Sequence, residues 1–291
     1  MKRAVLGSLC VLIVAVPLYA QSDAQKKQTI SYIQKLQADD GGFRADTRAK
    51  ESDLPATTAA FRALKYFGGA PRDRAACASF AEKCFDKDGG GFAAWPGGKA
   101  AYRPTAVGIM GVVDMKISSV PYADAVVKYL DEHSKGFEEI RLTAASFESL
   151  GKRPPHAEAW LMEIAKMRNA DDTYGKDDGM ARDSGGAVCA VLRLGGKVAH
   201  ADNVLKALND GQRKDGGFGK SGAENSDLET CYRVARAFHM LKTKPQGAER
   251  LREFLAHCRN DDGGYGVAPG KPSNVGGCYY AGIILHWLDE K

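Results

Sequence analysis

The chain has 291 residues, 44% of them hydrophobic, and a formal net charge of +5 at pH 7. A charge this mild, spread without long basic runs, gives no indication of nucleic-acid binding. A chain of this length can also bury a core unaided, so its seven cysteines do not indicate a disulfide-dependent scaffold.

Residues 1–20 have the three parts of a secretory signal sequence. Residues 1–3 form a basic head, residues 4–16 are apolar, and the segment ends on the small residue Ala20. The sequence therefore predicts cleavage after Ala20 and a secreted or periplasmic protein. A retained N-terminal membrane anchor is the alternative, although the apolar run is short for a membrane span.

Beyond the signal sequence, helices are expected in pairs. The predicted pairs are residues 29–36 with 55–67, 72–85 with 105–113, 122–132 with 142–150, 157–167 with 186–194, 201–209 with 228–241, and 248–258 with 277–288. The first helix of each pair is charged on one side, whereas the second is smaller and more apolar, which places it inside the fold. No alternating run is long enough to predict a strand.

A glycine turn of the form Asp-Gly-Gly-aromatic recurs between the paired helices. Clear copies begin at Asp40, Asp88, Asp215 and Asp262, and weaker copies lie at residues 135–137 and 171–175. Paired glycines suit a tight turn with positive φ, the aromatic ring can fill a gap between helices, and the Asp can accept hydrogen bonds from freed N–H groups. We therefore expect each copy to have a structural role.

Six tandem hairpins predict an all-α fold. Six apolar helices surrounded by six amphipathic ones close naturally into a ring. We therefore predict an α/α toroid (an α6–α6 barrel) of about six helical hairpins, formed by residues 21–291 as a single domain. An open solenoid is the alternative. Solenoids carry atypical terminal repeats, whereas the first and last copies here are among the clearest, which favours closure.

The glycine turns, the six helix pairs and the small inner helices resemble the prenyltransferase β-subunit and squalene cyclase repeat proteins. Residues 37–43 and 212–218 also resemble the Gln-Gly-aromatic motif of the cyclases. The resemblance covers essentially all of the mature chain and implies the toroid fold, which can carry many different sites. The Asp-x-Asp-Asp run that supplies the cyclase acid is absent from the sequence.

Protein prenyltransferases bind a catalytic Zn²⁺ through an Asp-x-Cys-Tyr motif and a His on the next inner helix. In this chain Glu229-Thr230-Cys231-Tyr232 occupies the place of the motif, and Cys278 occupies the place of the His. The resemblance therefore implies a zinc site formed by Glu229, Cys231 and Cys278, which are acceptable zinc ligands. The alternative is that both cysteines are small buried residues of the inner helices.

The same resemblance implies a diphosphate site beside the metal. The family's tyrosine is kept as Tyr232, but Ser184 stands where the family has a His. A leaving diphosphate needs cations or hydrogen-bond donors to take up its charge. Arg182, Lys220 and Arg233 are the nearby bases that could supply them, and we assign catalytic roles to Tyr232 and Arg182.

Three functions follow from these observations. The first is an exported, zinc-dependent transferase that moves an isoprenoid group from a prenyl diphosphate to a thiol, with a hydrophobic isoprenoid or lipid in the toroid cavity. Nothing in the sequence indicates the separate α subunit that such transferases use. The second is a non-catalytic toroid that binds a lipid, a peptide or a surface partner. The third is a carbohydrate-active lyase or hydrolase, which would need carboxylates converging at one mouth of the ring.

Overall fold

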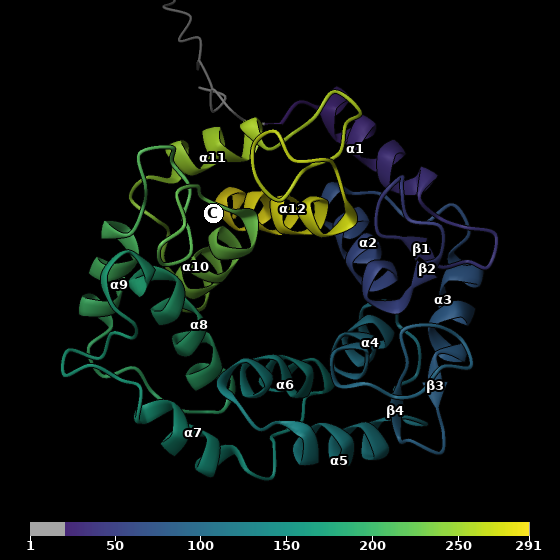
Figure 1. The fold of residues 1–291 in the computed structure, drawn as a ribbon, viewed down its shortest axis with the longest axis horizontal. Coiled ribbons are helices and arrows are strands. Elements are labelled where there is room, and N and C mark those ends of the chain that lie inside the picture. Colours follow the sequence, from purple (N-terminus) through teal and green to yellow (C-terminus); the bar gives the residue numbers. More distant parts are fainter. Residues whose placement is uncertain (1–20, 291) are drawn as a thin grey trace, which may run out of the picture.

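The computed structural model describes residues 21–290, so the predicted signal sequence lies outside the described residues. In this part of the chain, twelve α-helices form two concentric rings around a common axis (Figure 1). The predicted α/α toroid is therefore confirmed. None of the helices between residues 21 and 290 is both long enough and apolar enough to cross a membrane.

The two rings alternate along the chain. The outer ring contains α1 (Asp23–Lys35), α3 (Arg74–Lys83), α5 (Ala123–His133), α7 (Ala157–Ala165), α9 (Ala201–Asp210) and α11 (Ala248–His257). The inner ring contains α2 (Leu54–Phe67), α4 (Tyr102–Asp114), α6 (Phe137–Leu150), α8 (Met180–Arg193), α10 (Leu228–Met240) and α12 (Val275–Asp289). A 3-10 turn, η1 (Asp177–Gly179), precedes α8. The second helix of each pair thus lies inside, as predicted.

Two details differ from the prediction. Helix α8 begins at Met180, six residues earlier than expected, because Gly185 lies inside the helix and not in a turn. Two short antiparallel hairpins are also present: β1 (Phe43–Arg44) pairs with β2 (Ser52–Asp53), and β3 (Phe85–Asp86) pairs with β4 (Gly91–Phe92). Strands of two residues cannot show an alternating pattern, so the sequence did not reveal them.

Three of the four clear Asp-Gly-Gly turns use their Asp in the structural role that was predicted, whereas in the copy at Asp88 the Gly89 N–H donates to Asp86. The carboxylates of Asp40, Asp215 and Asp262 each accept the backbone N–H of the glycine two residues on, at 2.9 to 3.0 Å. The first glycine needs both its positive φ and its lack of a side chain. At Gly216, φ is +86° and a Cβ would lie 2.2 Å from the Arg250 carbonyl oxygen.

The aromatic residue that follows each turn is anchored to the start of an inner helix. Its backbone N–H donates to a short side chain at 2.8 to 3.3 Å, and the pairs are Phe43 with Thr57, Phe92 with Thr105, Tyr174 with Ser184, Phe218 with Cys231, and Tyr265 with Cys278. Five of the six hairpins therefore use one packing unit, in which Thr, Ser or Cys accepts the same hydrogen bond.

The last hairpin joins the first and closes the ring. Helix α12 packs against α2. The buried Thr29 hydroxyl on α1 donates to the Gly263 carbonyl oxygen at 2.8 Å, and the Val275 N–H donates to the Ala45 carbonyl oxygen at 2.9 Å. These contacts confirm the closed toroid over the open solenoid.

The third hairpin differs from the others in its connection. Only residues 134–136 join α5 to α6, whereas the other five connections run over residues 36–53, 84–101, 166–179, 211–227 and 258–274. This hairpin therefore contributes no long loop to the rim of the toroid. As a result, no such loop separates the start of α6 from the mouth of the ring.

Candidate functional site

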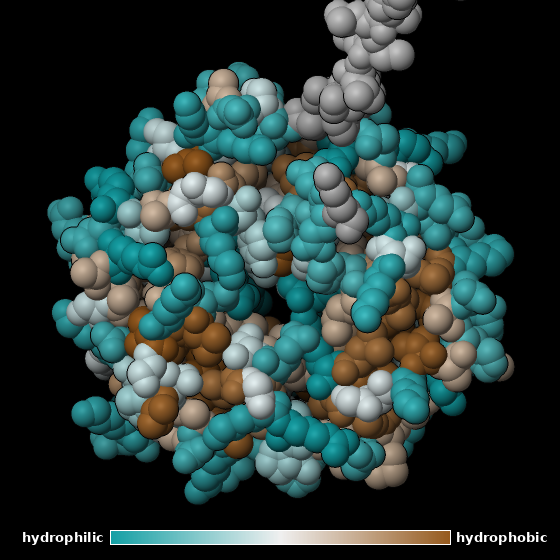
Figure 2. All heavy atoms as spheres, turned by 180° about the vertical axis from the view of Figure 1, so that it is seen from behind, coloured by the Kyte–Doolittle hydropathy of each residue, from teal (hydrophilic) through white to brown (hydrophobic). Residues whose placement is uncertain are grey.

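The inner ring encloses a central cavity of about 860 Å³. Its wall is polar: six arginines, seven carboxylates and five tyrosines line it, and they outnumber the aliphatic side chains. Figure 2 shows hydrophilic side chains around the central hollow, on the face opposite to that seen in Figure 1. A volume of this size is within the range of small-molecule sites.

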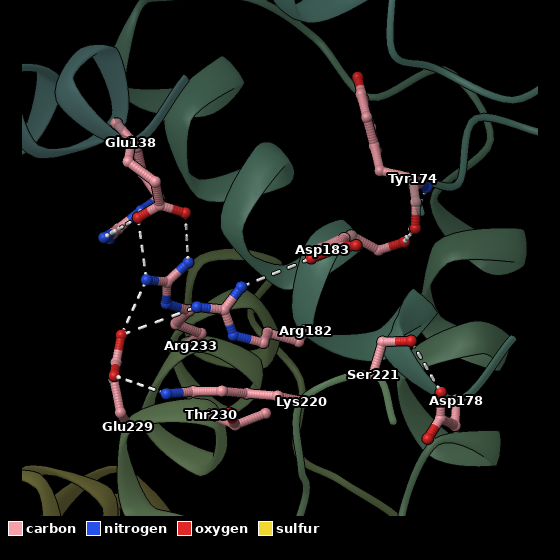
Figure 3. A network of polar contacts seen from close by, with 12 residues as sticks. Glu138, Tyr174, Asp178, Arg182, Asp183, Lys220, Ser221, Glu229, Thr230 and Arg233 are labelled. Atoms are coloured by element: carbon pink, nitrogen blue, oxygen red, sulfur yellow. Dashed lines mark hydrogen bonds and ion pairs between the residues drawn. The ribbon is translucent and has the colours of Figure 1, made fainter. Parts of the chain in front are cut away.

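One group of charges in this cavity is centred on Arg233 of α10 (Figure 3). Its guanidinium donates to both carboxylate oxygens of Glu138 on α6, at 2.7 and 2.9 Å, and to Glu229 one helical turn away at 2.8 Å. The Arg233 side chain is only 6% exposed. A forked, charge-assisted contact of this kind fixes α6 and α10 in orientation as well as in distance.

The carboxylate of Glu229 also meets two further cations. Arg182 Nη2 lies 3.8 Å and Lys220 Nζ 3.6 Å from its oxygens, so the bases predicted from the sequence do surround it. Burial would raise the pKa of Glu229, but the charges of Arg233, Lys220 and Arg182 outweigh it and lower that pKa. The same balance lowers the pKa of Glu138 to about 2. Both groups are therefore carboxylates at neutral pH, and neither can donate a proton.

The side chains proposed as zinc ligands do not fit a metal ion. The thiols of Cys231 and Cys278 are fully buried and accept hydrogen bonds from the N–H groups of Phe218 and Tyr265, while Glu229 is paired with cations in the cavity. Burial raises the pKa of Cys231 well above its usual value and that of Cys278 to about 12, so both are protonated thiols in the metal-free protein. Within residues 21–290, no three His, Cys, Asp or Glu side chains are grouped to hold a metal.

A second group, further along the inner helices, contains the predicted Tyr232. Its hydroxyl lies 3.4 Å from that of Tyr279 on α12. The Arg236 guanidinium lies over the Tyr232 ring and the Trp287 ring, 4.9 and 4.7 Å from their centroids. We call Tyr232, Tyr279 and Arg236 the tyrosine–arginine cluster.

Among the residues that the structure describes, Arg236 lacks the carboxylate partner that the neighbouring Arg62 and Arg193 have. Arg62 is paired with Asp114, and Arg193 is paired with Glu148. Within residues 21–290, Arg236 forms no ion pair, and its Nε atom is buried without a hydrogen-bond partner. The cavity therefore carries an uncompensated positive charge at this point.

Burial and positive charge balance differently at the two tyrosines. Burial would raise the pKa of Tyr232, but the charges of Arg236, Arg193 and Arg62 and the hydrogen bond from Tyr279 outweigh it and lower the pKa to about 8. For Tyr279, burial is the stronger influence, and together with the neighbouring Tyr232 it raises the pKa. The pair thus contains one readily ionised phenol and one that keeps its proton.

Sequence analysis singled out Tyr232 but gave no role to Tyr279 or Arg236. Two signals were present. Tyr279 follows Cys278 as Tyr232 follows Cys231 in the preceding unit, which places both tyrosines at the same point of adjacent inner helices. Arg236 is four residues after Tyr232, and residues with this spacing face the same side of a helix.

Fold and site together define a class: a closed α/α toroid with a charged central cavity. The chain belongs to the prenyltransferase alpha-alpha toroid domain family, whose model matches residues 4–194 and 122–290. This result confirms the resemblance inferred from the glycine turns. No curated protein matches the chain.

Solved structures with the same fold are described as different kinds of enzyme. The type II terpene cyclase MstE from Scytonema has a TM-score of 0.62 and 9% identity, over 94% of this chain and 98% of that one. A variant of a protein titled as a glycosidase has a TM-score of 0.58 and 12% identity, over 92% and 96%. An α-amylase from Clostridium perfringens has a TM-score of 0.59 and 11% identity, over 91% and 98%. At these identities the similarity shows the fold alone.

Proposed function

We propose that this protein is an exported carbohydrate-active toroid that takes a saccharide into its central cavity. The observation that carries the proposal is the polar wall, in which arginines, carboxylates and tyrosines outnumber aliphatic side chains. An isoprenoid chain presents only apolar surface, so it would desolvate the polar groups of this wall without offering them any hydrogen bond. A saccharide presents hydroxyl groups that can bond to them.

The five tyrosines add the second half of a saccharide site. Sugar rings have apolar C–H faces that pack on aromatic rings, and phenol hydroxyls bond to the sugar hydroxyls at the same time. Tyr280 illustrates the arrangement, because it lines the cavity and its ring centroid is 5.1 Å from that of Tyr232. Carboxylates of the same wall, such as Glu138, would accept hydrogen bonds from the hydroxyl groups of a bound sugar.

The fold itself does not choose between substrates, since solved toroids of this kind include enzymes titled as a terpene cyclase, a glycosidase and an amylase. The lining of the cavity supports the carbohydrate over the isoprenoid. Zinc-dependent prenyl transfer would need an ionised cysteine and three assembled ligands, which the site geometry does not favour, so we derive no step through a metal.

The proposal is tested by titrating the purified protein with neutral and acidic oligosaccharides and, separately, with a prenyl diphosphate, using calorimetry. We expect saccharide binding, and we expect Tyr280→Ala to weaken it by about tenfold, which corresponds to the loss of one aromatic contact. Tyr129→Ala, which removes a tyrosine from the outer helix α5, is the matched control. Binding of the prenyl diphosphate with no binding of any saccharide would overturn the proposal.

A further inference from the structure

We propose that the tyrosine–arginine cluster makes this protein a lyase for acidic saccharides, in which Arg236 binds the uronate carboxylate, Tyr232 removes the adjacent proton and Tyr279 protonates the leaving oxygen. This inference rests on the proposed carbohydrate function and deepens it by naming the substrate class and the reaction. The proposal gives a role to each of the three side chains of the cluster. A site that only binds a saccharide would not need them in this arrangement.

The choice of an acidic saccharide follows from Arg236. Its guanidinium faces two aromatic rings, forms no ion pair within residues 21–290 and leaves Nε without a hydrogen-bond partner. A carboxylate on the ligand would supply the missing charge and the missing acceptor. A neutral saccharide could supply an acceptor through its hydroxyl oxygens but not the negative charge.

The assignment of base and acid follows from the two phenols. Tyr232 and Tyr279 stand on adjacent inner helices with their hydroxyl oxygens 3.4 Å apart, so both reach the same side of a bound sugar. Their surroundings push their pKa values in opposite directions, downward for Tyr232 and upward for Tyr279. A pair separated in this way assigns the base to the first and the acid to the second.

The step is a β-elimination that balances without a co-reactant. The Tyr232 phenolate takes the proton from the carbon next to the uronate carboxylate. The electrons of that C–H bond form a carbon–carbon double bond to the neighbouring carbon, and the glycosidic C–O bond on that carbon breaks. The leaving oxygen takes the Tyr279 proton, and transfer of a proton from Tyr232 to Tyr279 then restores the pair. Arg236 stabilises the charge that develops on the carboxylate as the proton leaves.

Hydrolysis by Glu138 and Glu229 is less well supported. Hydrolytic cleavage of a glycoside needs a carboxylic acid that keeps its proton until it reaches the leaving oxygen. Glu138 and Glu229 share Arg233 and have lowered pKa values, so both lack that proton at neutral pH. Elimination needs no carboxylic acid, because the Tyr279 phenol retains a proton that it can donate to the leaving oxygen.

The experiment incubates the purified protein with polygalacturonate, alginate and hyaluronan and follows the ultraviolet absorbance of the unsaturated product. We expect turnover of at least one of them, a rate that rises as pH increases toward 8 as Tyr232 ionises, and losses of about 10²–10⁴-fold in Tyr232→Phe and Tyr279→Phe. Tyr129→Phe on the outer helix α5 is the control. Thermal melts of each variant show whether it is folded.

Binding is measured in the same experiment with Arg236→Gln. We expect this variant to lose its preference for acidic over neutral oligosaccharides. Binding of saccharides without any unsaturated product would overturn the lyase and leave the carbohydrate function standing. Failure to bind any saccharide would overturn both.

Discussion

At the scale of single residues, Cys231 and Cys278 show how one position can look like a ligand and serve as a packing element. Each thiol stands where other hairpins use a hydroxyl, and each accepts the N–H of the aromatic residue after the glycine turn. The equivalent residues are Thr57, Thr105 and Ser184. Thr or Ser occupies the same position in other hairpins of this molecule. Packing geometry and hydrogen bonding therefore explain which residue types stand at this position.

This equivalence makes Cys231→Ser a mild substitution. The hydroxyl can accept the same hydrogen bond from Phe218, so we expect unfolding free energy to change by less than about 1 kcal/mol. Cys231→Ala leaves the buried N–H unpaired and should cost about 1–3 kcal/mol. Urea unfolding measures both. Metal analysis of the reduced protein accompanies it, and one zinc per chain that disappears in the serine variant would restore the predicted metal site.

Tyr232 provides a prediction that does not depend on turnover. Burial opposes its ionisation, but the positive charges of Arg236, Arg193 and Arg62 outweigh burial and lower its pKa to about 8. An ultraviolet titration of the folded protein should therefore show one tyrosine ionising near pH 8. This step should disappear in Tyr232→Phe and move to higher pH in Arg236→Gln, because removing a positive charge makes the phenolate less stable. A titration in which every tyrosine ionises at about pH 10 or above, the usual range for a phenol, would contradict the cluster geometry.

The residue types of this site were only partly predictable. Tyr232, Arg182 and Glu229 could be named because a motif pointed to them. The structure places Tyr232 and Glu229 in the wall of one cavity, with Arg182 3.8 Å from Glu229. Arg236 could not be named, since its importance comes from lacking a partner, and partners depend on which helices face each other. A pattern along one helix does not contain that information.

At the scale of helices, one of the two adjacent glycines within α8 allows this helix to pack closely against α10. A Cβ at Gly185 would lie 3.0 Å from the Arg233 carbonyl oxygen on α10, whereas a Cβ at Gly186 would meet its nearest neighbour, Arg141, at 3.5 Å. The first glycine is therefore a contact point between helices. The second has room for a methyl group.

These adjacent glycines give a matched pair of variants. Gly185→Ala should lower the unfolding free energy by about 1–3 kcal/mol, because α8 and α10 must move apart. Gly186→Ala should be neutral or stabilising by up to about 1 kcal/mol, because alanine favours the helix. Thermal or urea unfolding of the two variants tests the difference. Equal effects at both positions would mean that α8 and α10 do not touch at Gly185.

Helix existence and order were predicted well, and helix ends were predicted less well. The twelve helices and their pairing follow from apolar patterning and from the glycine turns. The start of α8 was missed because Gly185-Gly186 has the same composition as the turns elsewhere in the chain. Only the neighbouring helix distinguishes a glycine that permits close approach from one that permits positive φ.

At the scale of the whole molecule, ring closure depends on contacts between residues far apart in the sequence. Thr29 is fully buried, and its hydroxyl donates to Gly263 across the junction between α1 and the last hairpin. We expect Thr29→Val to destabilise the protein by about 1–3 kcal/mol by leaving that carbonyl unpaired. Denaturant unfolding measures the loss, and Thr29→Ser, which keeps the hydroxyl, should recover most of it. Equal stability of the valine and serine variants would argue against this contact.

Because the last hairpin contacts the first, the ring could begin at any of its hairpins without changing the contacts between them. Because α12 lies against α2 and the first helix lies beside the last hairpin (Figure 1), joining residue 290 to residue 21 by a short linker would span a gap that is already bridged. The chain could then be opened within residues 151–156, between α6 and α7, as a circular permutant. The order in which the hairpins are synthesised would change, while each would keep the same two neighbours and the same side of the cavity.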